Sequence, residues 1–116
     1  MEKNVEAKSW RVTEPGILDV DRYLSSANAP DLEEDASLCI NSGARTMILN
    51  CSALSYMTGA GVRAFLDIAR KMYGAGGSVL IRGLGGQPRA LFFACGMDSV
   101  VPLVKEESRF PALRAV

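Results

Sequence analysis

Short apolar runs and segments with helical spacing alternate along this chain. Two largely apolar runs, at 45–51 and 78–82, have the length and composition of strands that are buried on both faces of a parallel sheet. Around them, apolar residues recur about every three or four positions, which is typical of helices with one buried face. The recurring positions are Leu32, Ala36, Cys39 and Ile40, then Val62, Phe65, Leu66, Ala69, Met72 and Tyr73, and finally Leu91, Phe92 and Ala94.

Residues near the start of the chain predict a β-hairpin. Apolar residues alternate at 9–13, turn-forming residues follow at 14–16, and an apolar pattern resumes at 17–20. Tyr23 and Leu24 are expected to extend the second strand of this hairpin. The hairpin would add an antiparallel pair to an otherwise parallel sheet.

Helix boundaries follow from capping and turn chemistry. Asn28 is expected to cap the first helix, and the second helix is expected to run from near Ala60 to Gly74. Pro88 suits the first turn of a third helix, which is expected to end at Gly96.

The order of these elements predicts an α/β fold. A hairpin followed by alternating helices and strands predicts a mixed sheet, with helices mostly on one face. An apolar piece at 100–103 closes the pattern, and the tail from 105 to 116 either docks as a last helix or frays. A chain of 116 residues falls in the size range of one domain, so a single domain over 1–116 is expected.

Composition narrows the range of partners. Lys plus Arg and Asp plus Glu number 13 each, so the net charge favours neither nucleic acid nor an anionic membrane. No apolar run approaches the roughly 20 residues of a membrane helix, and the first residues are too polar for a signal peptide. We therefore expect a cytoplasmic protein without membrane insertion, whose partner is chosen by a local surface.

The chain contains no histidine, which removes most catalytic and metal-binding arrangements. Ser-His and Cys-His nucleophile pairs, histidine bases and histidine metal ligands are all excluded. Neighbouring carboxylates at 33–35 and 106–107 point to different sides of a helix and are typical of a solvated face. We expect neither an enzyme nor a bound metal or cofactor.

The cysteines are Cys39, Cys51 and Cys95, and they have no CxxC spacing. Neither a disulfide framework nor a zinc site is therefore indicated, and packing in the core is expected for all of them. The alternative is a reactive thiol at Cys51, near the end of the central strand, which would require a lowered pKa.

Residues 55–63 join the central strand to the second helix. Because open α/β sheets place binding surfaces at the carboxyl ends of their strands, this junction is the leading candidate for a functional site. A glycine-rich segment at 83–86 is a second candidate, as a phosphate cradle at a helix start. It lacks the Lys-Ser or Lys-Thr pair of a nucleotide-binding loop.

Three patches, in the expected order along the chain, resemble STAS domains. The junction at 55–63 is similar to the signature loop of the family, in which an apolar residue precedes Asp-Ser or Ser-Ser, a small residue, glycine and an aliphatic residue. Residues 25–34 are similar to the approach to the family's first helix, and residues 94–98 to a small-x-Gly-Leu-Asp segment after its third helix. The resemblance implies a mixed sheet of roughly four or five strands with about four helices.

The resemblance also implies a function in protein binding. The STAS domain is the fold of anti-sigma factor antagonists, and the resemblance implies that this chain is one of them. Such a protein sequesters an anti-sigma factor of the serine kinase type and so frees a sigma factor for transcription. The implied partner-binding residues are Tyr56, Met57, Thr58, Gly59, Ala60, Gly61 and Arg63. The alternative is a STAS regulatory subunit of an ABC-type lipid transport or stress-sensing complex, and a homodimer is compatible with either function.

Gly59 departs from the family pattern. It aligns with the serine that a partner kinase phosphorylates in this family, and glycine has no hydroxyl to carry phosphate. Thr58, one residue earlier, is either an alternative phosphoacceptor or an ordinary helix cap. Trp10, Tyr23 and Tyr56 are candidate aromatic anchors for a partner, although burial in the core is the favoured interpretation of Trp10.

Overall fold

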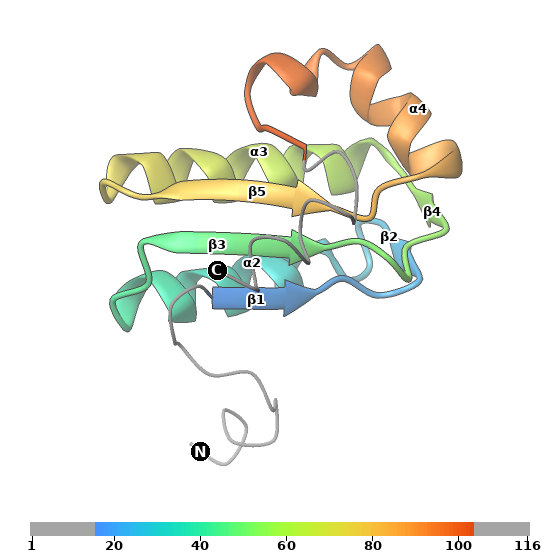
Figure 1. The fold of residues 1–116 in the computed structure, drawn as a ribbon. Helices are drawn as coiled ribbons and strands as arrows, with labels where there is room; N and C mark the ends of the chain where they lie inside the picture. The colour runs from blue at the N-terminus through green and yellow to red at the C-terminus, as the bar shows by residue number, and fades with distance from the viewer. Residues whose placement is uncertain (1–15, 104–116) are drawn as a thin grey trace, which may run out of the picture.

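The computed structural model describes residues 16–103, which form an α/β arrangement (Figure 1). Five strands, three α-helices and a short 3-10 helix follow one another along this part of the chain. Their bounds are Gly16–Asp19 (β1), Tyr23–Leu24 (β2), Ala29–Asn41 (α2), Thr46–Asn50 (β3), Tyr56–Met57 (β4), Gly59–Gly74 (α3), Ser78–Arg82 (β5), Gly86–Ala94 (α4) and Met97–Ser99 (3-10 helix). The α/β class expected from the sequence is confirmed.

The main sheet has the strand order β1-β3-β5, and both neighbouring pairs are parallel. Its register places Leu18 beside Leu49 and Leu49 beside Ile81, so each strand contributes one side chain to the same buried row. A parallel bridge between Ile81 and Leu103 continues the sheet beyond β5. All strand pairs between residues 16 and 103 are parallel, and the hairpin strand expected at 9–13 lies outside the described residues, as does the tail at 105–116.

β2 does not extend β1, contrary to the expectation from the sequence. It pairs in parallel with β4 in a separate two-stranded sheet, where Tyr23 lies beside Tyr56. The chain bends at Arg22, whose carbonyl accepts hydrogen bonds from the backbone N–H groups of Ser55 and Tyr56. These bonds direct the segment away from the main sheet and toward the loop that follows β3.

Two helices cover one face of the main sheet. α2 and α3 pack against each other behind the strands (Figure 1), and their buried residues include Ala36, Phe65, Ile68 and Met72. α4 lies apart from this layer, beyond the carboxyl ends of the strands, where it packs against β4. The described part thus has fewer helices than the resemblance implies, and one of them borders the edge where a site is expected.

Asn28 holds the loop before α2 and does not cap that helix through its side chain. It occupies the N-cap position but makes no side-chain hydrogen bond to the helix. Its Oδ1 accepts from Ser25 N at 2.9 Å, and its Nδ2 donates to Tyr23 O at 2.8 Å. The expected cap position is therefore confirmed, but the side-chain capping bond is absent, because the amide is already engaged by backbone groups of the preceding loop.

Candidate functional site

The candidate loop leads from the carboxyl end of β3 to α3 and lies beside β2 (Figure 1). α3 begins at Gly59, one residue before the expected start, and Gly61 lies in its first turn. The expected junction of strand, loop and helix is therefore present at the carboxyl edge of the sheet. Parallel α/β folds place their binding surfaces at this edge.

Backbone hydrogen bonds to β2 hold one edge of the loop. Tyr56 N donates to Arg22 O at 3.3 Å, and Thr58 N donates to Leu24 O at 3.0 Å. The N–H and the hydroxyl of Ser55 also donate to Arg22 O, at 2.8 and 3.2 Å. Sequence reasoning missed this support, because a strand of two residues carries no periodic signal.

Some of the expected contact residues form an open surface. Tyr56, Gly59 and Arg63 are exposed, and 49% of the Tyr56 surface is accessible. Thr58 and Ala60 are half-buried. The surface that a partner can reach therefore extends from Tyr56, the first residue of β4, to the second turn of α3.

Met57 and Gly61 are buried, so a partner can reach neither of them. A Cβ on Gly61 would lie 3.0 Å from Cγ and Cδ2 of Leu24 and 3.2 Å from Leu24 O, so a side chain there would crowd the contact between α3 and β2. A Cβ on Gly59, by contrast, would meet no atom within 4 Å. The buried pair thus determines where the loop lies, whereas Gly59 leaves open space in front of the first turn.

Thr58 is the N-cap of α3. Its backbone is extended, with φ −105° and ψ 179°, and its Oγ1 accepts a hydrogen bond from Ala60 N at 3.2 Å. The capping interpretation is therefore confirmed. Whether Thr58 is also phosphorylated stays a prediction.

Thr58→Ala is expected to lower the free energy of unfolding by about 1 kcal/mol, because it removes the acceptor for one helix N–H. Thr58→Ser keeps that acceptor and should stay within about 0.5 kcal/mol of the parent. Urea unfolding followed by circular dichroism measures both variants. Equal losses in the two variants would contradict a capping role for the hydroxyl.

The exposed ring of Tyr23 lies next to Tyr56 across the β2-β4 pair. Tyr23 has 58% of its surface accessible, and the Arg22 guanidinium carbon lies 5.8 Å from the centre of its ring. Cation–π contact of this kind orients both side chains at an exposed site. An aromatic and basic surface thus adjoins the loop, as the interpretation of these tyrosines as anchors requires.

Most of the chain matches a known protein family. The model of the STAS domain matches residues 8–109. The chain belongs to the STAS domain family. The recognition based on the three sequence patches is thereby confirmed.

Several known proteins resemble this STAS domain. BtrV from Bordetella bronchiseptica, which is named as a candidate anti-sigma factor antagonist, is 29% identical over 80 residues, or 69% of each chain. An anti-sigma factor antagonist from Mycobacterium paratuberculosis gives a TM-score of 0.75 at 17% identity, over 90% of this chain and 91% of the other. The anti-sigma factor antagonist SpoIIAA in its unphosphorylated form gives 0.72 at 19% identity, over 93% and 98%. The phosphorylated form of Bacillus SpoIIAA gives 0.65 at 19% identity, over 90% and 99%.

Two cysteines of this STAS domain are buried, and burial determines their chemistry. Burial raises the pKa of Cys51 to about 12. Burial, and to a lesser extent the charge of Asp35, raises the pKa of Cys39 to about 11. A reactive thiol at Cys51 would require a lowered pKa, so that alternative is wrong. Core packing is confirmed for these two residues and is wrong for Cys95, which is exposed.

At pH 8, iodoacetamide is expected to modify Cys95 at least about tenfold faster than Cys39 or Cys51, because the thiolate is the reacting form and buried thiols are inert. Peptide mass spectrometry over a time course measures the three rates. Addition of urea should equalise them, since unfolding exposes all three residues. Rapid labelling of Cys51 in the folded protein would contradict the buried position.

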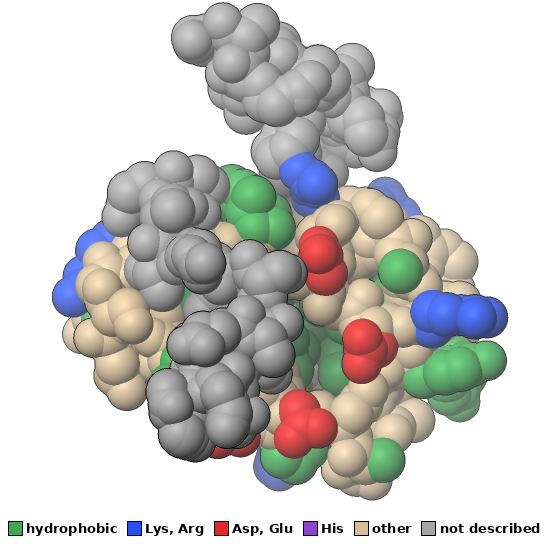
Figure 2. Space-filling model, turned by 90° about the horizontal axis from the view of Figure 1, so that it is seen from below, with side chains coloured by type: hydrophobic (Ala, Val, Ile, Leu, Met, Phe, Trp, Pro, Cys, Tyr) green, Lys and Arg blue, Asp and Glu red, His purple; other side chains and the backbone are tan. Residues whose placement is uncertain are grey.

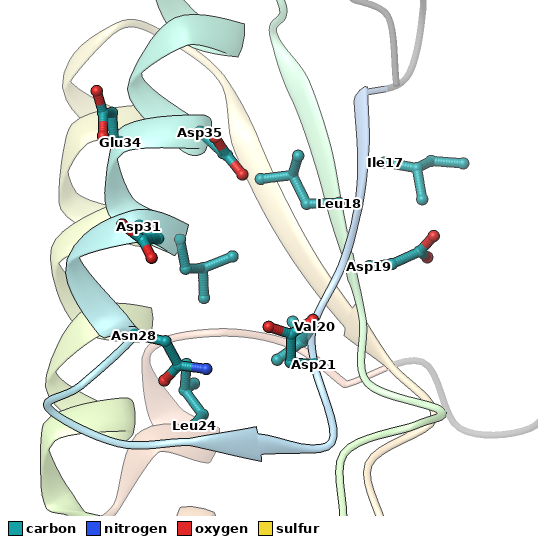
Figure 3. A pocket seen from close by; sticks show the side chains of 11 residues that line it. Ile17, Leu18, Asp19, Val20, Asp21, Leu24, Asn28, Asp31, Glu34 and Asp35 are labelled. Carbon is teal, nitrogen blue, oxygen red and sulfur yellow. The ribbon is translucent and has the colours of Figure 1, made fainter. Parts of the chain in front are cut away.

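A groove of about 430 Å³ lies between β1 and α2 (Figure 3). Leu18 and Leu24 point into it, and the carboxylates of Asp21, Asp31 and Asp35 stand around it. Figure 2 shows acidic side chains on this face of the molecule. Between residues 16 and 103, no group of three or more His, Cys, Asp or Glu side chains is placed to hold a metal ion. The groove contains none of the expected contact residues of the loop.

No helix in the described range is both long and apolar enough to span a bilayer.

Proposed function

We propose that this STAS domain is an anti-sigma factor antagonist that binds an anti-sigma factor of the serine kinase type in the cytoplasm. It would thereby regulate transcription that depends on a sigma factor. The observation that carries the proposal is the open surface at the start of α3. Gly59 and Arg63 lie one helical turn apart on the same side of α3, and the exposed Tyr56 directly precedes them.

The chemistry of this surface suits protein binding. Tyr56 offers a large apolar ring and a hydroxyl, a combination that is frequent where interfaces gain most of their binding energy. Gly59 lets a partner approach the backbone of the first helical turn, because no side chain intervenes. Arg63 supplies a fork of donors that fits a carboxylate on the partner. Binding on these terms requires no metal, cofactor or catalytic group.

Because of Gly59, binding by this STAS domain is not regulated by phosphorylation at the position that is usual in the family. The family loop has its phosphorylated serine at this position, and the relative SpoIIAA has been solved in both its unphosphorylated and its phosphorylated form. Thr58 is half-buried and its hydroxyl accepts a hydrogen bond from Ala60 N, which makes it a poor alternative site of phosphorylation. The complex with the anti-sigma factor should therefore persist in the presence of ATP.

The second candidate is a STAS regulatory subunit of an ABC-type lipid transport or stress-sensing complex. Gly59 favours it as well, because a subunit that remains in an assembly needs no phosphorylated serine. Pull-down from the native cytoplasm separates the two candidates. Recovery of a serine-kinase anti-sigma factor supports the first, and recovery of an ABC-type ATPase supports the second.

Arg63→Ala is expected to weaken binding of the recovered anti-sigma factor by about tenfold, and Tyr56→Ala by about thirtyfold, because exposed Arg and Tyr side chains are frequent hot spots. Isothermal titration calorimetry with the purified partner measures these affinities. Arg70→Ala is the matched control, since Arg70 is exposed on the same side of α3 two turns further from the loop. It should change the affinity by less than about twofold.

Equal weakening by Arg63→Ala and Arg70→Ala would indicate that the partner covers the length of α3 and does not select the loop. If neither Tyr56→Ala nor Arg63→Ala changes the affinity, the partner binds elsewhere on this STAS domain.

A further inference from the structure

The loop has a second edge, opposite to the one that β2 holds. Tyr56 N and Thr58 N both donate toward β2. Because N–H and C=O groups of successive strand residues point to alternate sides, the polar backbone groups of Met57 face the other way. The side chain of Gln87 meets both of them. Met57 N donates to Gln87 Oε1 at 2.9 Å, and Gln87 Nε2 donates to Met57 O at 2.9 Å.

We propose that Gln87 is a positioning residue that holds the partner-binding loop in its binding geometry. One side-chain amide supplies the acceptor and the donor that a neighbouring strand would otherwise supply to Met57. The orientation of this amide follows from chemistry, because Met57 N can only donate and Met57 O can only accept. The loop is thus bonded on both edges, by β2 on one side and by Gln87 on the other. The role of the loop in binding rests on the proposed function.

The position of Gln87 is itself well determined. Gln87 lies in the first turn of α4, and the next residue, Pro88, is fully buried. α4 packs against β4, so the backbone that carries the amide is anchored next to the residue that it bonds. Met57 is directly followed by the cap Thr58 and then by Gly59. A shift of Met57 would therefore move the start of α3 and the surface that a partner covers.

Gln87 is exposed, whereas its hydrogen bonds to Met57 are partly shielded from solvent. Water can replace the amide if it is removed, so the main expected effect is on the local order of the loop and only slightly on global stability. Gln87→Met retains the length of the side chain and removes both hydrogen-bonding groups. Arg89→Met is the control, since it also replaces an exposed polar side chain of α4 by methionine.

Gln87→Met is expected to raise the hydrogen-exchange rate of the Met57 amide at least about fivefold, while core amides such as that of Leu49 keep their rates. NMR-detected exchange on the full chain measures both. Arg89→Met should leave the Met57 amide unchanged. Unchanged exchange at Met57 in Gln87→Met would overturn the positioning role, whatever the variant does to binding.

Gln87→Glu distinguishes a role of residue 87 in hydrogen bonding from a role in packing alone. At pH 7.5 the carboxylate cannot donate to Met57 O, and its second oxygen would face that carbonyl oxygen and be repelled by it. The paired geometry should therefore be lost, and protection of the Met57 amide should fall. Well below the usual glutamate pKa of about 4.3, the protonated acid again offers one donor and one acceptor, and the protection factor should return toward that of the parent at the same pH. Protection that is equally low at both pH values would overturn the proposal.

Binding separates this inference from the proposed function. Gln87→Met should weaken the complex with the purified anti-sigma factor by about fivefold or more, and Arg89→Met by less than about twofold. Faster exchange at Met57 together with weaker binding supports the whole inference. Faster exchange with unchanged affinity overturns the role of the loop's geometry in binding, while the hold of Gln87 on Met57 and the binding of the anti-sigma factor both stand. Failure of the parent chain to bind the anti-sigma factor would overturn the proposed function and leave the exchange result untouched.

Discussion

Gly59→Ser is expected to convert this STAS domain into a substrate of the serine-kinase anti-sigma factor. A Cβ at this position would meet no atom within 4 Å, so serine fits without moving its neighbours. The new hydroxyl would be exposed in the first turn of α3, where the helix dipole favours a phosphate. After incubation with the kinase and ATP, mass spectrometry should find close to one phosphate per chain, at residue 59.

Phosphorylated Gly59→Ser should bind the anti-sigma factor about a hundredfold more weakly than the unmodified variant. The phosphate adds approximately two negative charges to a surface that the partner must cover closely. Gly59→Ala is the matched control, because it adds the same Cβ without a hydroxyl, and its affinity should be the same with or without ATP. Titration calorimetry before and after the kinase reaction measures the change.

The same kinase reaction on the parent chain distinguishes a protein that binds without regulation by phosphate from one whose phosphorylation site has moved to another residue. No phosphate on the parent supports the first, and phosphate on Thr58 supports the second. A Gly59→Ser chain that binds the kinase but is never modified would show that Gly59 does not occupy the position of the family serine.

Gly83→Ala is expected to lower the free energy of unfolding by about 3 kcal/mol, through backbone strain and steric overlap together. Gly83 has a φ of 80°, which non-glycine residues adopt only at a cost. A Cβ there would also lie 2.6 Å from Ser52 Oγ and 2.9 Å from Ser52 N. Because one of these neighbours is backbone, side-chain rotation alone cannot relieve the overlap. Urea unfolding measures the loss.

The overlap would displace a polar network that joins the ends of β1 and β3. Ser52 Oγ donates to Asn50 Oδ1 at 2.7 Å, and Asn50 Nδ2 donates to Asp19 Oδ1 at 2.9 Å. Gly76→Ala is the matched control, since Gly76 has a φ of 86° but a Cβ there would meet nothing within 4 Å. Gly76→Ala should lower the free energy of unfolding by about 1 kcal/mol, through backbone strain alone. Equal losses in the two variants would show that the Ser52 overlap is relieved by local movement.

Elements with a strong local pattern were predictable. The apolar run at 78–82 is β5, and the helix expected from near Ala60 to Gly74 is α3 from Gly59 to Gly74. In both cases the period of the buried residues and the flanking glycines are properties of adjacent residues. The location of the candidate site follows from the same pattern, because a loop between a parallel strand and a helix emerges at the carboxyl edge of the sheet.

Several expectations failed where a distant segment competes for the same groups. Tyr23 joins β4 and not β1, and Asn28 bonds the preceding loop in place of α2. Met57 and Gly61 belong to the recognised loop, yet both are buried and act as its support. Cys95 follows an apolar helix and is nevertheless exposed. Each outcome depends on packing between segments that are separate along the chain.

The sequence by itself determined the class of fold, the family and the place of the candidate loop. These follow from the spacing of apolar residues and from the identity of neighbours, which act over one or two turns of chain. Only the tertiary structure decided which loop residues reach the surface, and only it brought Gln87 onto the backbone of Met57, 30 residues earlier. A two-residue strand cannot hold its own orientation, so its geometry comes from partners whose proximity exists only after folding.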